Sequence, residues 1–420
     1  MSYLIDLATK NLFRNKLRSF ISILAIALSV ALVVFVKGLV GAFIDNMYSL
    51  HIQYQAGDIK IIDQEYQKKE RLLSLNYPVD GFNGGGIKAM EGELKRIKGI
   101  KRVIPRIKFG AAISTEDEMI RMMGWGVEAS KELEFTNIKD KLVEGRMVRR
   151  GQREVVMGAD LLKKIGLKVG DKTTILYQTS FASFKGSTFK IVGKIKSGLK
   201  LLDEELFYLP LDQAQKILEM PDMATDLLLE TDNYRDLEGV LAKVEQLFKD
   251  KSADQRYSII PWDKGYSMIG MLKVGEKIYN GIYIFLVILG AFVVINTMIM
   301  IVKERTKEVG MMTALGVKSK EILSMFIIEG IIMGMVGSFL GVIVGALITK
   351  LTAITGIIDY SKAMKGVSGN ILMNPIIRPE VDLSNLLYAF ILGVVVTAIT
   401  AIIPARKAAK LDPTEALRSN

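Results

Sequence analysis

The 420-residue sequence contains no cysteine, one histidine and two tryptophans. Without cysteine the chain forms no disulfide and no thiolate metal site, and His51 alone cannot build a histidine metal cluster. Acidic residues are also outnumbered, because 45 Asp and Glu face 56 Lys and Arg and leave a formal net charge of +11. The basic residues do not alternate with aromatic residues in a stripe, so this charge does not indicate a nucleic-acid partner.

Sequence patterns for catalysis are missing as well. A phosphate-binding loop requires G-x-x-x-x-G-K-[ST], and the segments GLKVGDKT (166–173) and GMMTALGVKS (310–319) miss this spacing. We interpret their glycines as structural. His51 has no accompanying serine and carboxylate pattern that would make it a general base. We therefore expect a chain that is not an enzyme and that carries no catalytic residue, no cofactor and no metal of its own.

Long apolar runs are abundant, since half of the residues are hydrophobic. Four runs are each long enough to cross a hydrocarbon core of about 30 Å, with some tilt: 20–36, 278–302, 322–349 and 386–405. A cleaved signal peptide is the alternative for the first run, which is longer than a usual signal-peptide core. The apolar stretch after Lys37 instead predicts a retained helix that continues above the membrane. The expected fold is an α-helical membrane protein with four transmembrane helices, one plus three.

Basic residues predict the orientation. They gather before the first run, between the second and third, and after the fourth: Lys10, Arg14, Lys16 and Arg18; Lys303, Arg305, Lys307, Lys318 and Lys320; Arg406, Lys407, Lys410 and Arg418. In a four-span chain these regions share one side, and the positive-inside rule places them, with both termini, in the cytoplasm. The segment between the first two spans then lies outside.

This large segment has the patterns of an α+β domain. Helices are predicted near 86–100, 159–165, 211–218 and 235–248, and strands at 109–115 and 118–127, with a hairpin of 172–178 and 187–195. The predicted organisation is residues 1–45 with the first transmembrane helix, 46–275 as the extracytoplasmic α+β domain, and 276–420 with three transmembrane helices and a cytoplasmic C-terminal tail.

A charged stretch, KERTKEVGMMTALGVKSKEI (303–322), separates the second apolar run from the third. Val309, Met312, Leu315 (or Gly316) and Val317 mark an apolar side, opposite a side of lysines and glutamates. This pattern predicts a short amphipathic helix at the cytoplasmic surface. It is either the docking site of another protein or an ordinary interfacial helix without a partner.

Small residues and one acid mark the third run. Five glycines repeat every three or four residues and share one helix face, which allows another helix to approach closely: Gly330, Gly334, Gly337, Gly341 and Gly345. The partner is either this chain's own second or fourth span or a second subunit. Because a carboxylate in a membrane helix avoids lipid, Glu329 is expected to have a partner inside the bundle.

Two apolar features lie outside the predicted membrane. Phe181 and Phe184 occupy the tip of the predicted hairpin, where they either form a binding surface or fold back onto the domain. Apolar residues also follow the first span and precede the second, where they could line a lipid-accessible cleft: Val40, Phe43, Ile44 and Met47; Met268, Met271 and Leu272. Flexible methionines suit varied acyl chains.

The charged stretch and the C-terminal PARKAAKLDPTEALR (404–418) resemble the MacB/FtsX/LolC-LolE superfamily of ABC permeases, most closely its lipoprotein-releasing members. Val309 stands where the family usually has Ile, and Val317 where it has Ala. Segments 8–20 and 142–171 are also similar to the family, so the resemblance covers nearly the whole chain. The matching residues are Glu304, Arg305, Glu308, Val309, Gly310, Ala314, Leu315 and Gly316, with Pro404, Ala405, Ala408, Pro413, Ala416 and Leu417.

The resemblance implies a machine in the bacterial inner membrane, with a periplasmic domain, in which two identical or homologous permease chains pair. A separate ATP-binding subunit carries ATP and Mg²⁺ and couples through Glu304, Arg305, Glu308, Val309, Gly310, Leu315 and Gly316. In lipoprotein-releasing members a hairpin holds a periplasmic lipoprotein carrier, and the loop at Phe181 and Phe184 is shorter than that hook.

Three functions fit this resemblance. The chain releases lipoproteins by mechanotransmission, or it is a MacB-type efflux permease for peptides or drugs, or it is an FtsX-like transmitter of a signal to a cell-wall hydrolase. The apolar cleft residues favour lipoprotein release.

Overall fold

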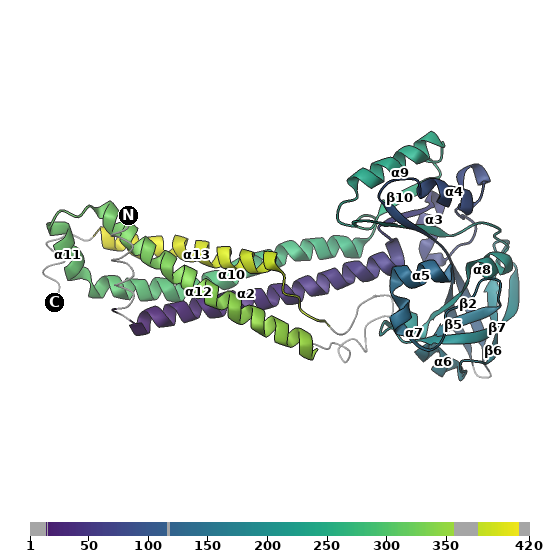
Figure 1. The fold of residues 1–420 in the computed structure, drawn as a ribbon, viewed down its shortest axis with the longest axis horizontal. Helices are drawn as coiled ribbons and strands as arrows, with labels where there is room; N and C mark the ends of the chain where they lie inside the picture. Colours follow the sequence, from purple (N-terminus) through teal and green to yellow (C-terminus); the bar gives the residue numbers. More distant parts are fainter. Residues whose placement is uncertain (1–13, 15, 116–117, 357–376, 411–420) are drawn as a thin grey trace. The chain divides into compact units, whose positions relative to one another are not determined.

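The computed structural model describes residues 14, 16–115, 118–356 and 377–410. The chain divides after Asp45 and again after Gly270. We call residues 46–270 the sheet unit, and residues 14–45, 271–356 and 377–410 the helical unit (Figure 1).

The helical unit consists mainly of four long helices, namely α2 (Lys16–His51), α10 (Ser267–Glu304), α12 (Ser319–Thr355) and α13 (Leu383–Ala409). Each is long and apolar enough to cross a membrane. They contain the four predicted runs, and α2 continues well beyond Lys37 as expected. The predicted arrangement of one plus three membrane helices is therefore confirmed.

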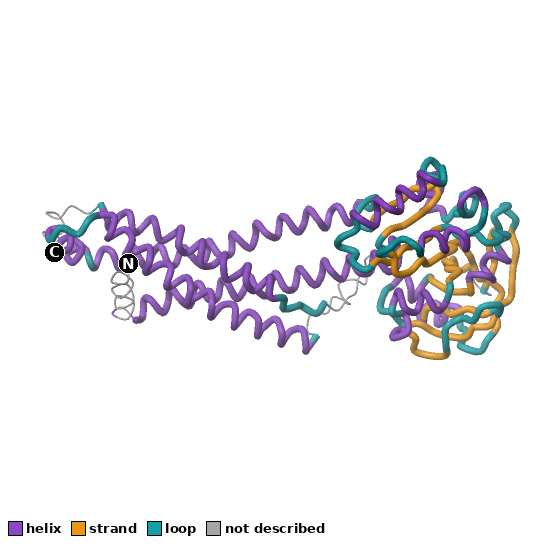
Figure 2. The backbone as a smooth tube through the Cα atoms, turned by 45° about the horizontal axis from the view of Figure 1, so that its top comes forward, coloured by secondary structure: helices purple, strands orange, loops and turns teal. Residues whose placement is uncertain are grey.

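The four helices run side by side and share one core (Figure 2). Val30, Val294 and Phe326 are fully buried in it, and Ala401 joins them from α13. Large apolar side chains on the outer faces stay exposed within the chain, as expected for surfaces that lipid covers: Leu28, Phe285, Phe339 and Ile399 are examples.

The glycine stripe of α12 faces two helices of the same chain. A Cβ atom at Gly337 would lie 2.8 Å from the Cβ of Ile26 on α2, and Gly341 and Gly345 face the same helix. Gly330 and Gly334 face α13. The stripe thus packs mainly against the first and fourth spans, and the Sδ of Met298 on the second span lies 3.8 Å from a Cβ built at Gly330. All five glycines are buried, so they leave no free surface for a second subunit.

The sheet unit is built on one mixed ten-stranded sheet with the order β10-β1-β9-β2-β3-β8-β5-β7-β4, while β6 pairs with β2 and β7. β3 pairs with β8, and β5 with β7, in parallel. The strands are β1 (Ile59–Asp63), β2 (Ile100–Ser114), β3 (Met119–Val127), β4 (Leu142–Gly145), β5 (Glu154–Gly158), β6 (Lys172–Gln178), β7 (Phe184–Ile195), β8 (Leu206–Pro210), β9 (Asp226–Thr231) and β10 (Tyr257–Pro261).

Short helices connect these strands (Figure 1). They are α3 (Gln64–Lys69), α4 (Ile87–Leu94), α5 (Ala129–Thr136), α6 (Ala159–Ile165), α7 (Lys200–Glu204), α8 (Leu211–Ile217) and α9 (Glu238–Asp250), with 3-10 turns η2 (Glu70–Leu72), η3 (Phe82–Gly84) and η4 (Ile138–Lys141). The predicted helices correspond to α4, α6, α8 and α9. The predicted hairpin is β6 and β7, which pair antiparallel. The α+β prediction is confirmed.

The end of α2 leads directly into the sheet. A π-helical turn, η1 (Ile52–Ala56), follows α2, and Gly57 then redirects the chain into β1 with φ +60°. A Cβ at Gly57 would lie 2.9 Å from the Cβ of Leu228, so the turn requires glycine both for its conformation and for space. Strand β10 is the last strand of the unit in the sequence and comes shortly before α10. It pairs antiparallel with β1, and Ile59 lies opposite Pro261.

Candidate functional site

The charged stretch forms a short helix, α11 (Thr306–Ala314), between α10 and α12 at one end of the bundle (Figure 1). The predicted short helix is thus present. The tight turn after it depends on Gly316, whose φ is +93°. Val317 N–H donates to the carbonyl of Met312 (3.0 Å), and Lys318 N–H donates to the carboxylate of Glu321 at the start of α12 (3.0 Å).

One side of α11 is buried and its C-terminal end is exposed. Val309 is fully buried and Gly310 is buried beside it. Leu315, which the sequence pattern placed on the apolar side, is 87% exposed. The reason for this difference is that α11 ends at Ala314, so the helical spacing does not extend to Leu315. Leu315 and the half-exposed Met311 therefore present an apolar surface among charged residues.

Ion pairs connect α11 to Arg14, just before α2, and the end of α10 to Arg18 in the first turn of α2. Arg14 contacts Glu308 (2.6 Å), Arg18 contacts Glu304, and Arg305 Nε donates to Glu308 (3.0 Å). Burial raises the pKa of Glu308, but hydrogen bonds from Arg305 and Arg14 outweigh it and lower the pKa below its usual range. Since exposed pairs contribute only about 0–1 kcal/mol each, we infer that this network orients α11 more than it stabilises the fold.

The partner of Glu329 is Arg305. Their side chains are 2% and 6% exposed, and Arg305 Nη1 lies 3.9 Å from Glu329 Oε2. Neither of these two atoms has a hydrogen bond within the described part of the chain. Arg305 therefore contacts both Glu308 of α11 and Glu329 of α12, and the contact with Glu329 is the longer of the two.

The hairpin tip carries two exposed aromatic rings. Phe181 is 76% exposed and Phe184 is 84% exposed. Ser180 N–H donates to the carbonyl of Leu218 (3.0 Å), so the base of the tip is tied down while both rings point outward. The alternative that the rings fold back onto the domain is wrong.

A buried cluster in the sheet unit was not predicted. The guanidinium of Arg106 on β2 makes two hydrogen bonds to Glu132 (3.0 and 2.7 Å) and donates to the carbonyls of Tyr54 and Gln53 in η1 (3.1 and 2.8 Å). Arg106 and Glu132 are both fully buried. The one signal in the sequence is the spacing of Arg106 and Lys108, which places two charges on the same face of an apolar strand.

Two more buried lysines lie on this sheet. Lys108 pairs with Asp226 (2.9 Å), and Lys60 on β1 pairs with Glu70. Burial raises the pKa of Asp226, but Lys108 and Lys60 together outweigh it and lower the pKa below its usual range. Burial lowers the pKa of Lys108 in spite of its partner.

The predicted cleft residues lie on two helices. Val40, Phe43, Ile44 and Met47 are on α2, and Met268, Met271 and Leu272 are on α10. They fall on both sides of the division between the units, so the cleft stays a prediction. The motif residues Pro404, Ala405 and Ala408 are buried at the end of α13, while Pro413, Ala416 and Leu417 lie outside the described residues.

The fold and the α11 segment together define a multi-pass membrane protein with an α+β domain inserted after its first span. Residues 19–247 match the family model of the MacB-like periplasmic core domain, and residues 280–413 match that of the FtsX-like permease C-terminal region. The chain belongs to the MacB/FtsX-like family of ABC transporter permeases, as the sequence motifs indicated.

Relatives in this family share about a quarter of their residues with the chain. An uncharacterised ABC transporter permease of Methanocaldococcus jannaschii is 26% identical, covering 60% of this chain and 58% of that protein. The uncharacterised permease YknZ of Bacillus subtilis is 24% identical over 99% and 98% of the two chains. The lipoprotein-releasing system protein LolE of Haemophilus influenzae is 26% identical over 79% and 80%.

Solved structures of two extracytoplasmic domains are also similar. The extracellular domain of YknZ matches with a TM-score of 0.34 and 13% identity, covering 48% of this chain and 98% of that one. The periplasmic region of MacB from Actinobacillus actinomycetemcomitans matches with a TM-score of 0.36 and 12% identity, covering 55% and 96%.

Proposed function

We propose that this chain is the permease subunit of an ABC transporter that releases lipoproteins from the bacterial inner membrane, using ATP hydrolysed by a separate subunit. The observation that carries this proposal is the 26% identity with LolE, which extends over about four-fifths of both chains and so includes more than either unit alone. A MacB protein of Agrobacterium fabrum is 32% identical, but over only 31% of this chain and 17% of that protein.

The proposed mechanism uses contacts that follow one another along the chain. A partner that presses on α11 would act through Glu308 on Arg14, just before α2, and through Glu304 at the end of α10 on Arg18 in α2. Helix α2 is unbroken to His51 and leads into η1, whose carbonyls are held by Arg106. A displacement of the coupling segment would therefore reach strand β2 without any substrate passing through the bilayer.

The partners follow from the same proposal. The ATP-binding subunit, with ATP and Mg²⁺, docks on α11 and the exposed Leu315. A second permease chain, identical or homologous, completes the membrane part. A periplasmic lipoprotein carrier binds the exposed rings of Phe181 and Phe184. The termini lie in the cytoplasm and the sheet unit in the periplasm.

A charge in the proposed lipid cleft tests the substrate. Because each buried CH₂ contributes about 0.8 kcal/mol, an aspartate in the cleft should weaken acyl-chain extraction strongly. We expect Met47→Asp and Met271→Asp to reduce lipoprotein release in proteoliposomes while the ATP-binding subunit still co-purifies. Val143→Asp, an equal change at an exposed position of β4, is the control for the exposed Met271 and should release lipoprotein normally. Met47 is only 4% exposed, so thermal unfolding must also show that the Met47→Asp protein is folded.

Photocrosslinkers at Val40 and Met271 identify what enters the cleft. We expect capture of a lipoprotein, with a yield that falls when ATP and an acceptor are added. Capture of a small peptide or drug, with normal lipoprotein traffic in a depleted strain, would replace this proposal by efflux. Capture of only a cell-wall hydrolase would replace it by signalling.

A further inference from the structure

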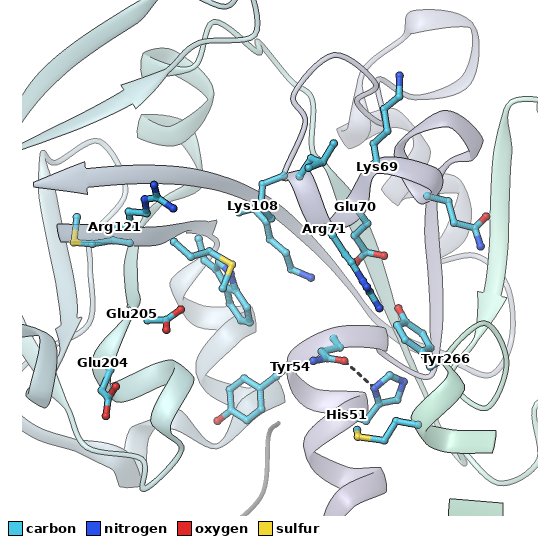
Figure 3. A pocket seen from close by; sticks show the side chains of 18 of the residues that line it. His51, Tyr54, Lys69, Glu70, Arg71, Lys108, Arg121, Glu204, Glu205 and Tyr266 are labelled. Atoms are coloured by element: carbon cyan, nitrogen blue, oxygen red, sulfur yellow. Dashed lines mark hydrogen bonds between the residues drawn. The ribbon is translucent and has the colours of Figure 1, made fainter. Parts of the chain in front are cut away.

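The sheet unit contains a pocket of about 1520 Å³ between two facing walls (Figure 3). Five consecutive residues of β3, Met119 to Met123, form one wall, and the segment Gln67 to Leu73 after β1 forms the other. Lys108, Trp125 and Tyr54 also line it. Alternate residues of a strand point to opposite faces, so five in succession reach one pocket only if the edge of the strand faces it.

This edge of β3 is unpaired along its first half. The parallel pairing with β8 begins where Met123 lies opposite Leu206, and the chain before β8 leaves the sheet as α7. Met123 N–H donates to the carbonyl of Glu205 across this edge (2.8 Å). By the two-residue period, Arg121 and Met119 direct their own N–H and C=O groups to the same edge. Among the described residues, no strand pairs with these two positions on that side.

Two uncompensated cations flank the open edge. Arg121 lies on the β3 wall and Arg71 on the opposite wall (Figure 3), and neither makes an ion pair with any residue that the structure describes. Two other charges of the lining are already paired, because Glu70 contacts Lys60 and Lys108 contacts Asp226. Glu204 and Glu205 lie at the end where β8 begins, whereas Lys69 and Lys164 add two more positive charges to the lining of the pocket.

We propose that this pocket binds an extended, acidic segment of another polypeptide, which adds a short strand to the open edge of β3. Alternating N–H and C=O groups match a peptide backbone, whereas a phosphate or an acyl chain would leave half of them unpaired. The acidic side chains would pair with Arg71 and Arg121. Exposed Leu72 and Met119 supply apolar contacts beside them. The inference needs no lipid and stands apart from the proposed function.

Peptide binding to the full-length protein in detergent tests the inference. The probe is a fluorescein-labelled octapeptide of alternating Glu and Val, followed by fluorescence anisotropy. Because hydrogen bonds to charged groups contribute about 1.5–3 kcal/mol, replacing Glu by Lys should weaken binding at least about tenfold. N-methylation of every second residue, which removes backbone donors and keeps the side chains, should also weaken it about tenfold or more.

Paired variants separate the side chain of Arg121 from its backbone. Arg121→Ala removes the charge and should weaken the probe about tenfold, and Arg121→Pro also removes the edge N–H and should weaken it several-fold further. Lys168→Ala, at an exposed position outside the pocket, should bind like the wild type. Thermal unfolding verifies that each variant is folded. The N-methylated probe tests the backbone hydrogen bonds a second time, with the wild-type protein.

Several results would overturn the inference. Equal affinity for the acidic, basic and N-methylated probes would mean that neither charge nor strand pairing matters. Displacement of the probe by millimolar inorganic phosphate or by anionic vesicles, with no effect of N-methylation, would identify an anion site instead.

Discussion

The buried charged side chains of the sheet unit need specific partners, because an unpaired charge is costly away from water. Arg106 is fully buried, yet every contact named above is a hydrogen bond to a charged or carbonyl oxygen. The Cζ of Arg106 lies 4.9 Å from the ring centroid of Trp125 and 5.7 Å from that of Phe135. Burial lowers the pKa of the guanidinium, but Glu132 outweighs this effect and raises it, so the group stays charged. Arg106 therefore fixes the turn η1 to the sheet by charge-assisted bonds.

Replacement of Arg106 tests this role. Arg106→Met leaves Glu132 buried without a partner and should cost about 3–5 kcal/mol, seen as a lower thermal unfolding midpoint. The double variant Arg106→Met/Glu132→Leu should recover most of that stability, because two apolar side chains replace the ion pair. Its η1 carbonyls still lack their donors, so substrate release per ATP should stay low. Full recovery of both stability and release would show that the bonds to η1 do not transmit motion.

The residue level was only partly predictable from the sequence. Glu329 was expected to have a partner because a lone carboxylate in a membrane helix is costly, but its partner Arg305 depends on how α11 folds back between two helices. Arg106 was not among the predicted residues. Its four oxygen partners come from Gln53, Tyr54 and Glu132, which no local pattern connects.

At the scale of elements, α11 is defined by its two ends. Arg305 interrupts the helix at one end, and Gly316 turns the chain toward α12 at the other. The element is short, and a helix of this length is not stable by itself, so its position depends on Val309 packing into the bundle and on the ion pair of Glu308 with Arg14. Changes at these points should affect coupling before they affect folding of the sheet unit.

We expect Glu308→Lys to uncouple ATP hydrolysis from transport. The new cation lies beside Arg305 and Arg14, so attraction becomes repulsion and α11 loses its orientation. Gly316→Leu should act similarly, because a φ of +93° costs a branched side chain about 1–3 kcal/mol. The measurements are ATPase activity and substrate release of the complex in proteoliposomes.

Lys350→Glu, a charge reversal near the other end of α12, is the control and should remain coupled. If both coupling variants release substrate normally and retain the ATP-binding subunit, α11 is only an interfacial helix.

Strands with alternating burial were predictable, and strands buried at every position were not. Strand β3 and the hairpin of β6 and β7 show alternating burial, which the sequence pattern reveals. Strands β1, β5 and β8 are buried at every position, so they lack alternation and were missed. Helix α11 was predicted, but the direction of Leu315 was not, because it depends on where the helix ends.

At the scale of the whole molecule, the arrangement of spans follows from length and hydropathy alone, and the distribution of charge predicts the side of the membrane. The natural absence of cysteine makes the orientation simple to test, since a single introduced thiol has no background. Lys139 and Lys318 are both exposed positions on opposite sides of the proposed membrane.

Cysteine at Lys139 should react with an impermeant thiol reagent in intact spheroplasts, and cysteine at Lys318 should react only after permeabilisation. The physical reason is the concentration of basic residues near Lys318, which are retained on the cytoplasmic side. Labelling is measured by gel shift, with the cysteine-free parent as the blank. Equal labelling of both positions, or the reverse pattern, would refute the proposed orientation.

The pairing of β1 with β10 has a mechanical consequence. The start of β1 follows η1 and the end of β10 precedes α10, and Ile59 opposite Pro261 places these two points at the same end of one antiparallel ladder. A force that separates them would break the hydrogen bonds of the ladder one after another, starting at Ile59 and Pro261. This needs less force than breaking several bonds at once. A force that moves both in the same direction carries the two strands together and leaves the bonds between them unloaded. The pair of β1 and β10 should therefore stay intact when its two connecting segments move together, and it should separate when they move apart.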